Sequence, residues 1–158
     1  MPISKRVARV QKALTEAGVR TRIIEMAGST HTAQEAADAI GCDVEQIAKS
    51  LVFRGEESGA LVLVVASGPN RVDESAVAKA LGEAVAMADP KAVRIGTGFP
   101  VGGVPPIGHN AKLPTFIDHA LLRHAEIWAA AGTPNSVFVL SPAELQRITD
   151  GQILSVGG

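Results

Sequence analysis

The sequence predicts an α+β fold in which helices surround a mixed, largely antiparallel sheet. Segments with helical periodicity and segments with strand composition alternate along the 158 residues. Two strand-like runs are separated by the polar residues 54–59, which contain two glycines and are typical of a hairpin. Hairpins join antiparallel strands, whereas a doubly wound parallel sheet needs a long crossover between neighbouring strands. Apolar residues make up 46% of the chain, so we expect one domain over residues 1–158.

Apolar spacing, capping patterns and turn residues locate each element along the chain. Thr32, with Glu35 three residues later, forms the pattern of a capping box. Two later helices begin with an N-cap that precedes a proline, at Asp89 and Ser141. In chain order we expect a helix at residues 4–17, a strand at 20–26, a helix at 33–40, a helical turn at 43–47, strands at 49–53 and 61–66, a turn at 67–70, a helix capped by Asp73 and ending at 81, a strand at 85–88, a helix at 90–95, strands at 115–117, 126–130 and 136–140, and a helix at 142–149.

Residues 97–109 (TGFPVGGVPPIGH) fit neither a helix nor a central strand. The segment contains three prolines, which fix φ and lack an N–H donor, and four glycines. It also carries four apolar side chains, so it is not a solvated linker. A rigid apolar loop with glycines brings backbone N–H groups close to a small ligand. The alternative interpretation is a buried crossover between two strands.

The charge balance argues against a protein that holds nucleic acid by phosphate contacts alone. The formal net charge is −1, whereas such proteins are usually basic. Cys42 is the single cysteine, so no intrachain disulfide forms, which fits a reducing cytoplasm. The N-terminal residues lack the apolar core of a signal peptide, and no apolar run approaches the length of a membrane span. We therefore expect a cytoplasmic protein.

Lys49 is the most informative charged residue, because it begins an apolar strand. A lysine in that position can face a concave site and hold a phosphate as a point charge, or it can reach out to solvent from the strand end. The four histidines show no metal-ligand spacing, so we expect neither a metal nor a cofactor. No phosphate loop, dinucleotide fingerprint or nucleophile elbow is present. An enzyme with this sequence would therefore rely on its substrate for part of the reacting groups.

Six segments, taken together, resemble a known family. They are residues 29–37, 46–53, 87–90, 97–108, 114–118 and 130–132. The segment around Lys49 and the pattern Gly102-x-x-x-Pro106 are the most specific of them. The segments are similar, in the same order, to the YbaK and prolyl-tRNA synthetase editing-domain family of trans-acting aminoacyl-tRNA deacylases. The resemblance implies a mixed α/β fold around a curved sheet and hydrolysis of the ester between a wrong amino acid and the terminal adenosine of a tRNA, commonly tRNA for proline.

The resemblance also implies a set of site residues. In such proteins the lysine that matches Lys49 is needed for activity and lies near the 3′ acceptor end of the tRNA. The loop that matches residues 102–106 positions the aminoacyl carbonyl through backbone N–H groups, and a water or a substrate group attacks, with help from the vicinal ribose hydroxyl. The catalytic residues implied are Lys49, Gly102 and Gly103. The substrate-binding residues expected are His31, Thr32, Ser67, Phe99, Val104, Pro105, Pro106, Ile107 and His109.

Three of these residues have structural alternatives. Thr32 is expected to cap a helix, Ser67 to form a turn, and His109 to be satisfied by backbone groups within the loop. The chain also departs from the family pattern, because it has no tyrosine and lacks a basic pair after Gly132. Alanine, 2-aminobutyrate, cysteine, serine and threonine are the amino acids considered for the substrate, with cysteine the one these departures disfavour.

The near-neutral charge predicts weak binding of tRNA by the protein alone, so prolyl-tRNA synthetase or an elongation factor is the partner expected to deliver it. Two alternative functions remain open at this stage. One is a deacylase for a different mischarged tRNA. The other is a non-catalytic protein of the same fold that binds aminoacyl-tRNA or a nucleotide.

Overall fold

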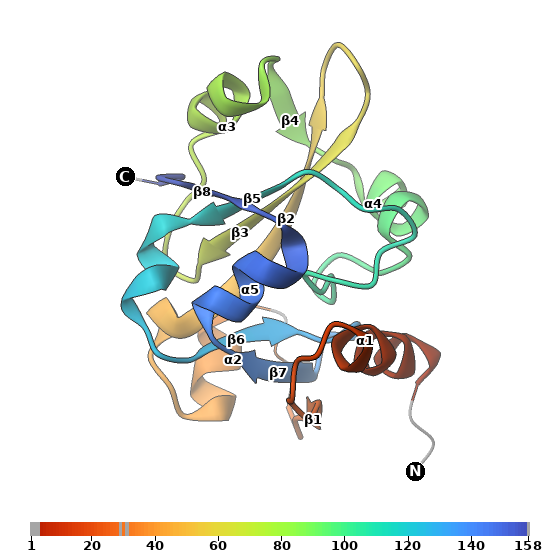
Figure 1. Ribbon diagram of the computed structural model, residues 1–158, viewed down its shortest axis with the longest axis vertical. Coiled ribbons are helices and arrows are strands. Elements are labelled where there is room, and N and C mark those ends of the chain that lie inside the picture. The colour runs from red at the N-terminus through yellow and green to blue at the C-terminus, as the bar shows by residue number, and fades with distance from the viewer. Residues whose placement is uncertain (1–3, 29, 31, 158) are drawn as a thin grey trace.

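The computed structural model describes residues 4–28, 30 and 32–157, which form helices packed around one mixed sheet (Figure 1). The α-helices are α1 (Lys5–Glu16), α2 (Ala33–Ile40), α3 (Glu74–Leu81), α4 (Pro90–Thr97) and α5 (Pro142–Thr149), and the 3₁₀ helices are η1 (Val44–Gln46) and η2 (His119–Arg123). The strands are β1 (Ile24–Glu25), β2 (Ile47–Gly55), β3 (Leu61–Ser67), β4 (Val85–Met87), β5 (Thr115–Asp118), β6 (Ile127–Ala130), β7 (Ser136–Leu140) and β8 (Gln152–Leu154).

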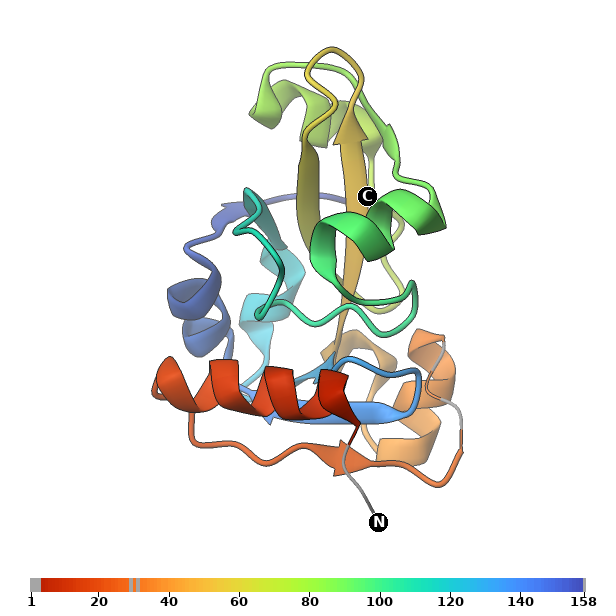
Figure 2. The same ribbon diagram turned by 90° about the vertical axis from the view of Figure 1, so that its right-hand side faces the viewer.

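The sheet has the order β1-β7-β6-β2-β3-β5-β8, and β4 also pairs with β2. Strands β2 and β3 form the predicted antiparallel hairpin, which stands out as the long ribbon in Figure 2. Among the described residues, four strand pairings are antiparallel and three are parallel. The predicted mixed sheet is therefore confirmed.

Strand β2 lies at the centre of the sheet, and one of its edges is interrupted. Its first two residues pair with β6, and its last three pair with β4. Between these two partners, no described strand pairs with this edge over residues 49–52. The opposite edge is paired with β3 from Ala48 to Arg54. A gap therefore opens beside Lys49 in the middle of the sheet.

The two faces of the sheet carry separate apolar clusters. Alternate residues of β2 and β3, such as Val52 and Leu63, lie in the larger cluster with Leu14 of α1 and Leu145 of α5. The intervening residues belong to a second cluster on the α3 side, which includes Phe53, Val62, Val64 and Val77. A third, smaller cluster holds α2 against the start of β2. Strand β2 is therefore packed against apolar side chains on both of its faces.

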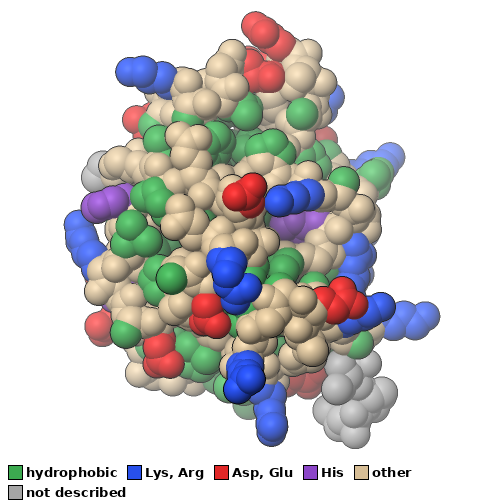
Figure 3. Space-filling view, in the orientation of Figure 1, with side chains coloured by type: hydrophobic (Ala, Val, Ile, Leu, Met, Phe, Trp, Pro, Cys, Tyr) green, Lys and Arg blue, Asp and Glu red, His purple; other side chains and the backbone are tan. Residues whose placement is uncertain are grey.

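The surface mixes charges of both signs. Figure 3 shows acidic and basic side chains interspersed with apolar ones on the face drawn, in line with the formal net charge of −1. Within the described part of the chain, no helix combines the length and the apolar character needed to cross a membrane.

The capping predictions for α2 and α5 are confirmed. The side chains of Thr32 and Ser141 accept hydrogen bonds from the N–H groups of Glu35 and Glu144, and both capping boxes are complete. The predicted strand at residues 20–26 is wrong in extent, because only Ile24 and Glu25 pair with β7. The Gln11 side chain bonds the backbone of Thr21 and Ile23 and replaces a strand partner there.

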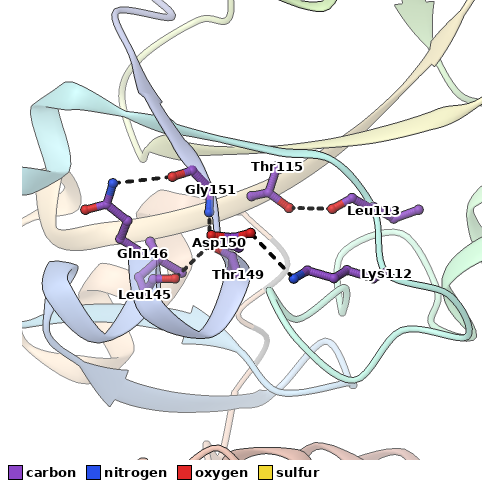
Figure 4. Close-up of polar contacts among 8 residues, drawn as sticks. All are labelled: Lys112, Leu113, Thr115, Leu145, Gln146, Thr149, Asp150 and Gly151. Atoms are coloured by element: carbon purple, nitrogen blue, oxygen red, sulfur yellow. Dashed lines mark hydrogen bonds and ion pairs between the residues drawn. The ribbon is translucent and has the colours of Figure 1, made fainter.

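Two elements were not predicted, η2 and β8. Helix α5 ends at Asp150 in the left-handed conformation, with φ of 55°. The Gly151 N–H then donates to Thr149 Oγ1 at 3.1 Å, and Gln146 Nε2 donates to the Gly151 carbonyl (Figure 4). This reversal lays residues 152–154 beside β5 in parallel register. Three residues carry too short a pattern for a strand prediction.

Candidate active site

A cavity of about 500 Å³ lies at the unpaired stretch of the edge of β2. The residues that line it come mainly from α2, β2, β6, the turn after β3 and the loop after α4. Four of the predicted site residues meet there: Thr32, Lys49, Gly102 and Val104. Most of the remaining wall is apolar, and the residues include Ala33, Ala36, Val44, Ile47, Leu51, Val101, Trp128, Ala129, Ala130 and Val137.

Lys49 is held at the cavity by the turn that follows β3. Its Nζ donates a hydrogen bond of 2.9 Å to the Gly68 carbonyl, and the side chain is half-buried. Burial lowers the pKa of Lys49 below its ordinary value of 10.5, and the nearby Asp118 carboxylate acts in the opposite direction. The ammonium group therefore has a fixed direction and an anionic neighbour.

Asp118 anchors the turn that holds Lys49. This carboxylate is 2% exposed. Its Oδ2 accepts from the Ser67 N–H at 3.0 Å and from Asn70 Nδ2 at 2.9 Å, and its Oδ1 accepts from the Ala120 N–H at 3.0 Å. The Asp118 side chain therefore joins the start of η2 to both ends of the turn at residues 67–70. Sequence reasoning missed this role, because the partners lie about fifty residues apart in the chain.

Ser67 and Gly68 hold the turn against η1. The Ser67 hydroxyl donates to the Glu45 carbonyl at 2.7 Å, so this buried side chain fixes the turn and does not line the cavity. A Cβ atom on Gly68 would lie 2.2 Å from the Val44 carbonyl oxygen. Only glycine permits so close an approach of the turn to η1.

The loop at residues 97–109 contributes its middle to the cavity. Gly102 has φ of 90° and lines the cavity together with Val101 and Val104. The Gly103 N–H donates to the Pro100 carbonyl at 3.0 Å and is therefore already engaged. The N–H groups of Gly102 and Val104 donate to no acceptor in the described part of the chain. Both residues line the cavity, so their amides are the candidates for contact with a ligand.

The two ends of the same loop face away from this cavity. Phe99 is completely buried in the larger apolar cluster, with the Arg9 guanidinium carbon 5.2 Å from its ring centroid. His109 Nε2 lies 2.6 Å from the Pro105 carbonyl, as its structural alternative predicts. The residues Pro106, Ile107 and His109 line a separate cavity of about 220 Å³, and Pro105 is buried. These five residues are therefore not brought to the cavity at Lys49.

Thr32 and His31 are the remaining predicted site residues. Thr32 lines the cavity, but its hydroxyl accepts the capping hydrogen bond from the Glu35 N–H at 3.1 Å, as its structural alternative predicts. His31 lies outside the described residues. Sequence reasoning missed Ser50 and Trp128, both of which line the cavity. The signal for Ser50 was a polar residue beside Lys49 in an otherwise apolar strand.

The described residues contain no group of three histidine, cysteine, aspartate or glutamate side chains that could hold a metal ion. Cys42 is half-buried next to the α2 cluster, and burial raises the pKa of its thiol. The cavity is thus lined by the Lys49 cation, by Gly102 and Val104 of the loop and by apolar walls, and among the described residues its lining includes neither this thiol nor a carboxylate. That set of groups suits binding and polarisation of a carbonyl.

Comparisons with known proteins agree on one family. The family model described as the aminoacyl-tRNA editing domain matches residues 27–148. The uncharacterised protein YwhH of Bacillus subtilis is 33% identical over 131 residues, which cover 83% of each chain. EbsC of Enterococcus faecalis, named as a candidate Cys-tRNA(Pro)/Cys-tRNA(Cys) deacylase, is 29% identical over 126 residues, covering 79% of this chain and 76% of that protein.

A solved structure extends this agreement to the whole fold. It is the crystal structure of a candidate trans-editing enzyme for prolyl-tRNA synthetase, which is 43% identical to this chain. The two structures superpose with a TM-score of 0.93 over 99% of each chain. The family-model match spans the strands, the turn and the loop that form the cavity. The chain belongs to the aminoacyl-tRNA editing domain family.

Proposed function

We propose that this protein is a trans-editing deacylase that hydrolyses mischarged aminoacyl-tRNA, with tRNA(Pro) carrying a small non-cognate amino acid as its substrate. The observation that carries the proposal is the cavity at the gap in β2, where Lys49 meets the Gly102 loop. Family membership supports the ester hydrolysis. The names of EbsC and of the trans-editing structure support the link to proline.

In this mechanism, loop amides stabilise the oxyanion. The N–H groups of Gly102 and Val104 donate to the carbonyl oxygen of the aminoacyl ester as negative charge develops there. One such donor contributes about 2.7–4 kcal/mol to lowering the barrier. Gly103 acts indirectly, because its bond to Pro100 fixes the loop before substrate binds.

Water supplies the nucleophile. Its oxygen adds to the ester carbonyl, the bond between the carbonyl carbon and the ribose oxygen breaks, and the ribose oxygen takes up a proton. The vicinal ribose hydroxyl assists this proton transfer, which accounts for a cavity whose lining includes neither a carboxylate nor a thiol. Lys49 binds a phosphate at the 3′ end and so orients the ester toward the loop.

The walls of the cavity favour small side chains. The cavity of about 500 Å³ is lined by alanines of α2 and β6 and by Val101 and Val104, and it must also admit the terminal ribose. A synthetase pocket separates amino acids that differ by one methylene by only about 1–3 kcal/mol, so a second, size-limited site removes the remaining errors. Alanine, 2-aminobutyrate, cysteine, serine and threonine are the amino acids that we propose for this site.

A partner that delivers the tRNA is part of the proposal. The net charge of −1, and the mixed charges on the face drawn in Figure 3, offer little long-range attraction for a polyanion. A prolyl-tRNA synthetase or an elongation factor would supply the affinity that the deacylase lacks. Tight binding of tRNA by the purified protein at physiological salt would contradict this part of the proposal.

The test is deacylation of tRNA(Pro) charged in turn with each of the five small amino acids and with proline. We expect release of at least one small residue, retention of proline, and a loss of about 100-fold or more in kcat/KM for Lys49→Ala. Lys79→Ala, which changes an exposed lysine of α3 outside the cavity, is the matched control.

Two results would redirect the proposal. Hydrolysis only after the tRNA body is exchanged would identify a deacylase for a different tRNA. Binding without hydrolysis of any charged tRNA would identify a non-catalytic protein of the same fold. Full activity in Lys49→Ala would contradict the role given to this lysine.

A further inference from the structure

The hydroxyl of Ser50 has unused hydrogen-bonding capacity at the cavity. Ser50 lines the cavity, and its buried Oγ has no hydrogen-bond partner among the described residues. Four other polar side chains of the lining make hydrogen bonds. Thr30 donates to the Pro134 carbonyl, Thr32 caps α2, Gln34 donates to Asp38, and Lys49 donates to Gly68.

The backbone of Ser50 points toward the same gap. The Val52 carbonyl accepts from the Ala88 N–H at 3.0 Å, so the main-chain groups of Val52 face the interrupted edge of β2. Main-chain groups two residues apart on a strand face the same edge. Those of Ser50 therefore also face this edge, over the stretch where no described strand is paired with it.

An unpartnered hydroxyl in this position is unfavourable unless a ligand satisfies it. A buried polar group without a partner costs free energy, and that cost is recovered when a ligand donates or accepts the missing bond. Rotation about the single Cα–Cβ bond moves the hydroxyl between staggered positions without moving the strand. The Oγ atom is closed to solvent in its present position, so a ligand in the cavity engages Ser50 after this rotation, while β2 stays in place.

We propose that Ser50 is a specificity-determining residue that selects a hydroxyl-bearing aminoacyl group, serine or threonine, over alanine and 2-aminobutyrate. The inference rests on the proposed deacylase function and names the substrate class of the same cavity. The hydroxyl of a bound seryl or threonyl group pairs with Ser50 Oγ, whereas an aliphatic side chain leaves that oxygen unpaired. Sites that hydrogen-bond a substrate hydroxyl discriminate strongly against analogues that lack it.

The cavity provides the contrast that such selection needs. Apart from Ser50, the lining contributed by β2, β6 and the loop includes the apolar side chains of Val101, Val104 and Ala129. A substrate hydroxyl that enters this apolar wall loses its water and finds a partner in Ser50. Cysteine, whose thiol is a weak donor and acceptor, gains less from the same contact.

The first experiment measures kcat/KM for tRNA(Pro) charged with serine, threonine, alanine or 2-aminobutyrate. Wild type is expected to favour the two hydroxyl-bearing substrates by about tenfold, the fold-change that corresponds to one hydrogen bond of this kind. Ser50→Ala is expected to lower the ratio of kcat/KM for serine to that for alanine by the same factor. Ser75→Ala, at an exposed serine of α3, is expected to keep the wild-type ratio.

A second measurement does not depend on hydrolysis. Adenosine analogues that carry a seryl or alanyl group through a stable amide are titrated into wild type and Ser50→Ala, with thermal unfolding as the check on folding. We expect wild type to bind the seryl analogue more tightly and Ser50→Ala to bind both alike. Equal wild-type affinities, or an unchanged preference in Ser50→Ala, would overturn the inference.

The outcomes separate this inference from the proposed function. If wild type hydrolyses alanyl-tRNA but shows no preference for serine, the deacylase function stands and the role of Ser50 fails. If wild type hydrolyses none of the charged tRNAs, the proposed function fails, and the analogue titration still decides whether Ser50 recognises a hydroxyl.

Discussion

Among single residues, Lys49 combines burial with a required charge. Burial lowers its pKa below 10.5, and Asp118 only partly opposes this. If the ammonium form binds the tRNA phosphate, kcat/KM falls as pH rises through the lowered pKa. Lys49→Arg, whose guanidinium keeps its proton throughout this range, is expected to retain some activity and to lack this alkaline decrease.

The measurement is kcat/KM against pH for both proteins, after subtraction of the spontaneous ester hydrolysis. Lys79→Arg, at an exposed position of α3, is the matched control and is expected to follow the wild-type curve. An identical alkaline decrease in wild type and Lys49→Arg would assign the titration to another group. The sign is fixed, because desolvation disfavours the charged form of a lysine.

Residues of the site differ in how far the sequence could reveal them. The position of Lys49 in an apolar strand left open whether it faces a concave site or reaches out to solvent, and the family resemblance implied its role in the site. Phe99 and Ile107 were expected to bind substrate because of the family resemblance, but burial in the core cannot be told from burial against a ligand by residue type. Asp118 and Ser50 depend on partners, or on the absence of partners, that only the folded chain defines.

At the scale of elements, the turn between β3 and α3 depends on the buried carboxylate of Asp118. Asp118→Ala removes the acceptor for the N–H groups of Ser67 and Ala120 and for the Asn70 amide. We expect the free energy of unfolding to fall by about 3 kcal/mol, the size typical of losing hydrogen bonds to a buried charged group. Activity is expected to fall as well, because Gly68 no longer holds Lys49 in place.

Denaturant unfolding and kcat/KM measured on the same preparation test this prediction. Glu56→Ala, at an exposed position of the hairpin between β2 and β3 and outside the cavity, is the control and is expected to stay within about 0.5 kcal/mol of wild type. An Asp118→Ala protein as stable and as active as wild type would show that the turn is held by other contacts.

Elements with local signals were predicted better than elements defined by pairing. Helices α2 and α5 begin at the expected residues, because a capping box depends only on two side chains three residues apart in the sequence. Strand β1 is shorter than expected, since the Gln11 side chain bonds the residues before it. Strand β8 exists only because the reversal at Asp150 brings three residues to the edge of β5.

At the scale of the whole molecule, the cavity is a product of sheet order. Strands β6 and β4 pair with opposite ends of the same edge of β2, and the space between them becomes the site. The residues that line the cavity are spread along the chain between Thr30 and Val137. The hairpin in the sequence predicted a mixed sheet, but no local sequence pattern predicts which strands pair with the central strand β2. The gap therefore could not be predicted, although the residues around it were partly identified.

The loop at residues 97–109 contributes to both the cavity and the core, and the titration of His109 makes the stability of the protein depend on pH. The His109 Nε2–H donates to the Pro105 carbonyl, and the ring lies edge-on to Phe99 with centroids 6.3 Å apart. Burial lowers the pKa of His109 below its ordinary value of 6.5; the bond to Pro105 opposes this shift, and Arg9 adds to it. The unfolded chain therefore binds a proton at a higher pH than the folded chain does.

Stability is consequently expected to decrease as pH falls below 6.5 toward the lowered pKa of His109, because the unfolded state binds more protons in that window. One such group changes the free energy of unfolding by at most about 1.4 kcal/mol per pH unit. His109→Gln, whose amide can still donate to Pro105, is expected to show a shallower decrease between pH 7.5 and 5 in denaturant unfolding. His119→Gln, at an exposed histidine, is the control. If His109→Gln and wild type lose stability equally over this range, the decrease in stability at acid pH is caused by groups other than His109.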